Sequence, residues 1–257
     1  MNPIFSGFIA SLSAGLATVI GALPVLLPIN LTQRVQAIAL GFGGGVMLAA
    51  TAFSLIIPGT EAAIKLGISQ MGAALIMAVG VLLGGVFLLL THKYLPHEHF
   101  FKGEEGVSGR NIKRIWLFIA AITIHNFPEG LAVGVNFGAG NPADGTPLAI
   151  GIGLQNIPEG LVVALSLVAE KYTPIYAVGV SLLTGLVEPI GGLIGASVVA
   201  IAQPILPLAM AFAAGAMLFV ISDEIIPESH SKGNEQEATI GVMVGFVIMM
   251  LLDIGLG

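Results

Sequence analysis

The stretches HNFPEG at residues 125–130 and QNIPEG at residues 155–160 repeat one polar motif inside long apolar segments. The chain around them has 257 residues, of which 56% are hydrophobic and 9% are charged, with a mean hydropathy of +0.98. Soluble domains average about 25% charged residues, and so few charges cannot cover a globule in water. The sequence therefore predicts a protein that is solvated by a lipid bilayer.

Apolar segments of about 20 residues are long enough to cross a bilayer as helices. They predict an all-α, polytopic membrane protein forming one transmembrane domain over residues 1–257. The first segment has no basic n-region and is too long for a signal-peptide core, so it is read as a span. We expect eight spans, with seven as the alternative because the linkers near Pro174 and Pro204 are short. The expected spans are about 4–28, 35–57, 70–91, 114–137, 147–169, 174–201, 205–227 and 238–256.

Eight of the nine Lys and Arg residues fall on one face of the membrane if eight spans are correct. Lys65 alone falls on the other face, and five of the eight lie in or next to the loop 92–113. The positive-inside rule then predicts that this loop is cytoplasmic and that both termini lie outside a cell (cytoplasmic) membrane. A net charge of −6 argues against nucleic acid as a partner.

Three carboxylates, Glu129, Glu159 and Glu188, fall deep inside the fourth, fifth and sixth expected spans, with no Lys or Arg at their depth to pair with. Each costs roughly 2.5–3.5 kcal/mol at the bilayer centre, even on lenient scales. They lie roughly 18–22 Å from the faces at which their spans enter, so one shared site is geometrically allowed. The alternative is that they are protonated and hydrogen-bonded between helices; three together favour a cavity that holds a cation.

Within each copy of the motif, a potential ligand and a glutamate are four residues apart and share a helix face. The pairs are His125 with Glu129 and Gln155 with Glu159, and Asn126 and Asn156 each lie about 100° around the helix, toward a neighbouring second position. Pro128 and Pro158 each remove a backbone N–H. We therefore expect Pro-broken helices in spans four and five, which run in opposite directions and form a central metal site.

The available ligand types limit the metal. The chain has no Cys, which excludes thiolate ligands and argues against Cu(I). Imidazole with carboxylates favours Zn, then Cd, Fe, Mn or Ni, over Ca. The ion is expected as a substrate rather than a cofactor, and its binding should depend on pH because it displaces protons. The chain lacks H-E-x-x-H and nucleotide-binding motifs, so it is not expected to be an enzyme. An intramembrane metalloenzyme and a metal exporter remain as alternatives, because sequence does not set the direction of transport.

The doubled motif, together with LVEPIGG around Glu188 and ISDEIIPESH at 221–230, resembles the ZIP (Zrt/Irt-like) family of divalent metal transporters, in its compact prokaryotic branch. The resemblance covers essentially the whole chain. It implies an intramembrane, often binuclear site, a homodimer, and an elevator-like movement of the metal-bearing helices. The positions that match the family's ligands are His125, Asn126, Glu129, Gln155, Asn156, Glu159, Glu188 and, as a thioether, Met47.

Two matched positions depart from the pattern of many family members. Gln155 stands where many have His, and Asn156 stands where some binuclear members have Asp. Gln is a neutral, weaker ligand, and Asn removes a bridging charge. The second metal position and the selectivity are therefore open.

Two further groups near the cytoplasmic face are candidates for metal handling or exit. His92, His97 and His99 lie at the end of the third span, with a solvated loop as the alternative reading. The second group lies toward the end of the seventh span, where charge at the membrane interface is the alternative; it consists of Asp223, Glu224, Glu228 and His230.

Overall fold

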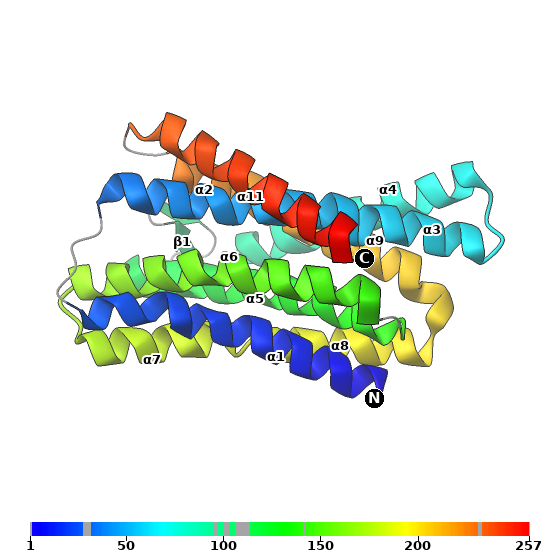
Figure 1. The fold of residues 1–257 in the computed structure, drawn as a ribbon, viewed down its shortest axis with the longest axis horizontal. Coiled ribbons are helices and arrows are strands. Elements are labelled where there is room, and N and C mark those ends of the chain that lie inside the picture. Colours follow the sequence, from blue (N-terminus) through cyan, green and yellow to red (C-terminus); the bar gives the residue numbers. More distant parts are fainter. Residues whose placement is uncertain are drawn as a thin grey trace.

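The computed structural model describes residues 2–27, 32–94, 97–99, 103–105, 114–140, 142–230 and 233–256. Long helices run side by side along one axis (Figure 1). Their bounds are α1 Pro3–Ala22, α2 Gln33–Ala50, α3 Ile57–Lys65, α4 Gln70–Tyr94, α5 Arg114–Gly138, α6 Pro142–Ala169, α7 Pro174–Gly185, α8 Glu188–Ile201, α9 Leu206–Val220, α10 Ile226–Ser229 and α11 Glu235–Leu256. Short 3₁₀ turns cover Leu23–Leu26 (η1) and Gln203–Ile205 (η3).

The loop expected over 92–113 contains a small antiparallel ribbon. Strand β1, His97–His99, pairs with β2, Gly103–Glu105, with His97 opposite Glu105. A sequence of alternating polar residues this short carries no apolar face that would have predicted a strand. The fold is otherwise helical in the part of the chain that the structure describes.

Seven helical segments of the described chain are long and apolar enough to cross a membrane. The protein is therefore a multi-pass membrane protein. These segments are Pro3–Leu26, Gln33–Lys65, Gln70–Thr91, Gly145–Ala169, Pro174–Ile201, Gln203–Ser229 and Glu235–Leu256. Helix α5, which carries HNFPEG, has 25 residues and is not one of the seven.

The expected breaks at Pro128 and Pro158 are not observed. Both prolines lie inside continuous α-helices, α5 and α6. A proline removes one hydrogen bond, and the remaining ladder holds the helix when neighbouring helices pack against it. The break lies instead in the next span, where α7 ends at Gly185 and α8 begins at Glu188, directly before Pro189.

Two other prolines follow a widened helical turn. Residues Thr51–Ile56 (η2) and Ile221–Ile225 (η4) form π-helical turns. Pro58 lies two residues after the first turn, and Pro227 lies two residues after the second. A π-turn inserts an extra residue and relieves the clash between the proline ring and the preceding carbonyl groups. The second of these turns carries Asp223 and Glu224, so it decides where those acids point.

The helices form two layers (Figure 1). Helices α1, α5, α6, α7 and α8 make one layer, and α2, α3, α4, α9 and α11 make the other, with both termini at the same end. Within each layer glycines bring backbones together: a Cβ on Gly134 would collide with Gly192 of α8, and one on Gly245 would collide with Phe42 of α2. Such close approach is the usual basis of helix association in lipid.

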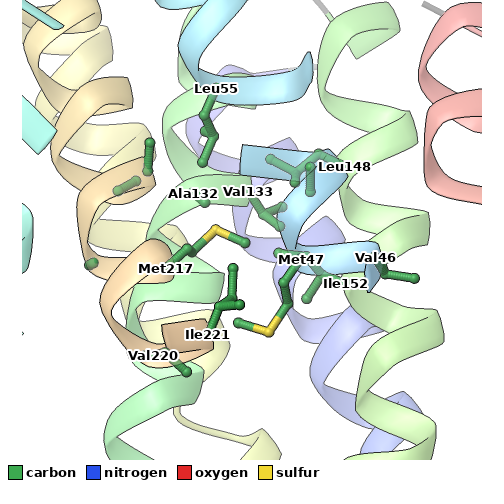
Figure 2. Packing of buried hydrophobic residues seen from close by; sticks show 14 of the residues in the cluster. Val46, Met47, Leu55, Ala132, Val133, Leu148, Ile152, Met217, Val220 and Ile221 are labelled. Carbon is green, nitrogen blue, oxygen red and sulfur yellow. The ribbon is translucent and has the colours of Figure 1, made fainter. Parts of the chain in front are cut away.

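Between the layers, larger apolar side chains interlock instead. Met47 and Val46 from α2 pack beside Leu148 and Ile152 from α6, and Met217 of α9 lies near Val133 of α5 (Figure 2). The two layers therefore meet through side chains, whereas the helices within each layer meet through backbones.

Candidate metal site

Three helices of one layer bring the predicted ligands together in the interior. His125, Asn126 and Glu129 lie on α5, Gln155, Asn156 and Glu159 on α6, and Glu188 is the first residue of α8. All are buried; Glu159 is 7% exposed, and the others are exposed by 2% or less. Such burial of polar groups is expensive unless something compensates it.

Two amides of the second motif donate to carboxylates of other helices. Gln155 Nε2 donates to Glu129 Oε1, and Asn156 Nδ2 donates to Glu188 Oε1 over 2.6 Å. The same Asn156 amide donates to the carbonyl of Ala14 on α1 over 2.9 Å. Gln155 and Asn156 therefore hold α5, α8 and α1 around α6, a role that their neutral amides can fill and that a carboxylate could not.

His125 is paired across the two layers. Its Nε2 lies 2.5 Å from Oε1 of Glu224, which is 5% exposed on η4. Glu224 was predicted in an exit route, and its direct contact with His125 was not predicted. About a hundred residues separate the two groups, and no local pattern in the sequence reports such a pairing.

Oxygen atoms without hydrogen-bond partners accumulate at this place. One oxygen on each of six side chains is buried and accepts no hydrogen bond among the described residues. These atoms are Asn126 Oδ1, Glu129 Oε2, Gln155 Oε1, Asn156 Oδ1, Glu159 Oε1 and Glu188 Oε2. Native interiors leave only a few polar groups unsatisfied per 100 residues, and each such group calls for an explanation. Among the described residues, these oxygens outnumber the amide donor left without a partner there, Asn126 Nδ2. Such an excess of acceptors over donors is the arrangement that a cation would satisfy.

The predicted ligands are neighbours, but they do not yet surround a single point. Among the described residues, no three His, Asp or Glu side chains stand in a metal-binding group. The hydrogen bonds explain this, because Glu129, Glu188 and His125 each turn toward a different partner. Ion binding therefore requires these side chains to exchange a hydrogen-bond partner for the ion.

Comparison with known proteins identifies the family of the chain. The family model described as "ZIP Zinc transporter" matches residues 96–253. Zinc transporter GufA of Myxococcus xanthus is 50% identical, over 98% of this chain and 99% of that protein. The chain belongs to the ZIP family. Two further relatives are zinc transporter ZIPB of Bordetella bronchiseptica, 44% identical over 94% of this chain and 78% of that protein, and zinc transporter ZupT of Chlorobium phaeovibrioides, 33% identical over 98% of each. Membership in this family of transporters confirms the expectation that the chain is not an enzyme.

In this ZIP family member the remaining candidate ligand, Met47, lies in an apolar environment. Its side chain is 2% exposed and belongs to the buried cluster between the layers, close to Ile221 (Figure 2). The packing alone accounts for its burial, so its role as a thioether ligand stays a prediction.

The acids predicted to form an exit route separate into two groups. Glu224 and Glu228 line a small cavity together with Glu159 of the central group. Asp223 is half-buried and does not line that cavity. The ring of His230 contacts Thr239 Oγ1, 3.1 Å away, and Ser229 Oγ, 3.0 Å away. The side chains of His92, His97 and His99 lie outside the described part of the chain, so their role in handling metal stays a prediction.

Proposed function

We propose that the chain carries divalent transition metal ions, zinc foremost, across the membrane through the site formed by α5, α6 and α8. The six buried oxygen atoms without hydrogen-bond partners carry this proposal. Leaving a polar atom buried and unsatisfied costs about 1–3 kcal/mol, and a bound cation offsets that cost. The named activity of GufA, ZIPB and ZupT points to zinc. Imidazole and carboxylate ligands also suit Cd, Fe, Mn and Ni.

We place the exit on the side of the cavity lined by Glu159, Glu224 and Glu228. Glu159 belongs to the ligand group and Glu224 contacts His125, so the cavity begins at the site itself. An ion that leaves His125 can next bind to the carboxylate of Glu224, which contacts His125. The positive-inside rule predicts that the face nearest this cavity is cytoplasmic, and we propose uptake, with this cavity as the exit.

We propose that α5 is the eighth span, since its 25 residues pack in the same layer as α1, α6 and α8. Eight spans are consistent with termini at one end of the molecule, and the positive-inside rule places that end outside the cell membrane. Helices α4 and α11 keep much of their apolar surface exposed. That surface faces lipid, and one part of it is our candidate for a homodimer contact.

Flux into proteoliposomes tests the function. The purified protein is reconstituted, and uptake of Zn, Cd, Fe, Mn and Ni is followed at several pH values. We expect zinc uptake that is lost in a Glu129→Ala/Glu159→Ala double variant and retained in Ser166→Ala, which removes a buried hydroxyl elsewhere on α6. Unchanged zinc uptake in the double variant would refute the proposed site. If preloaded vesicles lost zinc and empty vesicles took none up, the proposed direction of transport would be refuted.

A further inference from the structure

Asn136 is a buried polar side chain that the central site does not use. It lies on α5, it is 1% exposed, and its Oδ1 accepts no hydrogen bond among the described residues. Its Nδ2 donates to the carbonyl of Ala132 on the same helix, over 3.1 Å, and within the described part of the chain the amide bonds to no other helix. An interhelical packing role would use the amide across an interface, and this one does not.

The position of Asn136 relates it to the ligands. It follows Glu129 by seven residues and His125 by eleven, and these spacings return to the same face of a helix. The rise between Glu129 and Asn136 is about 10.5 Å at 1.5 Å per residue. Asn136 is thus displaced from the site toward the end of α5 at Gly138, away from the contact of His125 with Glu224.

The surroundings make this amide unusual. Its neighbours on α5, Val133 and Phe137, belong to the large apolar cluster between the layers. An amide buried there is less favourable than an apolar residue of the same shape, because its oxygen has no donor. The cost is explained if a cation intermittently supplies the missing partner.

We propose that Asn136 Oδ1 is an oxygen ligand for a divalent cation at an outer position, through which the ion passes before it reaches Glu129. This rests on the proposed transport function. A neutral amide is a weak ligand, and that suits a transit position, since conduction requires binding strong enough to enter and weak enough to leave. A carboxylate at this place would hold the ion and would carry an unpaired charge whenever the ion was elsewhere.

Two substitutions test the role with opposite expectations. Asn136→Leu removes the oxygen at similar size; we expect the initial rate of zinc uptake into proteoliposomes to fall at least fivefold, while zinc affinity in detergent, measured by competition with a chelating dye, stays within twofold of the wild-type value. Asn136→Asp adds a charged oxygen; we expect a lower half-saturating zinc concentration together with a lower maximal rate, because the ion is retained.

A purely structural role gives a different pattern. Both variants would then lower the maximal rate and the melting temperature, with the half-saturating concentration unchanged, and this result would overturn the proposal. Uptake by Asn136→Leu within twofold of wild type would overturn it as well. If the Leu variant fails to fold, the half-saturating zinc concentration of Asn136→Asp still distinguishes a ligand role from a structural role. Failure of the wild-type protein to take up zinc would instead refute the proposed function. Ser166→Ala serves as the matched loss of a buried polar group.

Discussion

At the scale of single residues, the two copies of the motif do different work. In the first copy His125 and Glu129 offer an imidazole and a carboxylate, whereas in the second copy Gln155 and Asn156 act as hydrogen-bond donors to carboxylates on other helices. A hydrogen bond to a charged group contributes about 1.5–3 kcal/mol. The unequal halves therefore stabilise the arrangement of helices as well as offering ligands.

Replacing Asn156 by Asp should separate these two roles. The change removes the donor to Glu188 and to the Ala14 carbonyl and places two carboxylates together. We expect the protein in EDTA to lose about 1–3 kcal/mol of stability and to bind one additional zinc ion, which would bridge the two carboxylates. Thermal denaturation with and without zinc measures the first effect, and equilibrium dialysis with elemental analysis measures the second.

Asn156→Leu is the control for this experiment. It should lose comparable stability without gaining an ion, because it brings no new charge. The same zinc stoichiometry in the Asp variant and in the wild-type protein would contradict a second position at Asn156.

The contact between His125 and Glu224 predicts that Glu224 weakens zinc binding at equilibrium and speeds the release of the ion. Glu224 competes with an ion for Nε2 of His125. Because a hydrogen bond to a charged group contributes about 1.5–3 kcal/mol, Glu224→Ala should tighten equilibrium zinc binding by more than about tenfold. Maximal uptake should fall, because the departing ion loses its next ligand. Dye competition and proteoliposome flux measure the two quantities; weaker binding together with faster uptake would show that Glu224 does not compete for His125.

At the scale of helices, the sequence predicted the apolar segments closely but misplaced the break. Hydrophobic length alone defines a span, so 174–201 was predicted as one unit and the structure retains that extent as Pro174–Ile201. Whether a proline interrupts its helix depends on packing. Pro128 and Pro158 lie in helices held on several sides, while Pro189 follows a turn at Leu186 and Val187 that starts a new helix.

That new helix begins at Glu188, a residue that depends on a close contact between α5 and α8. A Cβ on Gly130 would lie against the backbone of Glu188, closer than side chains approach in proteins. Gly130→Ala should therefore push α8 away, lower the melting temperature and weaken zinc binding by tenfold or more. Gly179→Ala on α7 is the matched control, since a Cβ there meets nothing within 4 Å and should change neither property. Equal behaviour of the two variants in melting and dye-competition assays would refute the importance of this contact.

At the scale of the whole molecule, helices pack differently within a layer than they do between the two layers. Within a layer, glycines allow close contact between helix backbones, as between Gly134 and Gly192. If one helix slid along the other there, their backbones would clash. Between the layers, Met47 and Met217 contribute flexible side chains, which re-pack more readily than branched ones. The sequence showed where the glycines are, but not which helices they join, because those pairings link segments far apart in the chain. This contrast favours relative movement of the layers as two rigid units.

A cross-link between the layers tests that movement directly. The chain has no cysteine, so an introduced pair is the only thiol pair present. Gly43 of α2 faces Gln155 of α6 with a Cβ separation of 3.6 Å, within the range of 3.5–4.5 Å that a disulfide requires. In the Gly43→Cys/Gln155→Cys variant we expect oxidation to abolish zinc uptake and reduction to restore it to the level of Gln155→Cys alone. The reduced protein is the exact control, since it differs from the oxidised one by one bond. If a quantitatively oxidised sample carried zinc as fast as the reduced one, the layers would not need to move, and transport would have to proceed by side-chain rearrangement within a fixed frame.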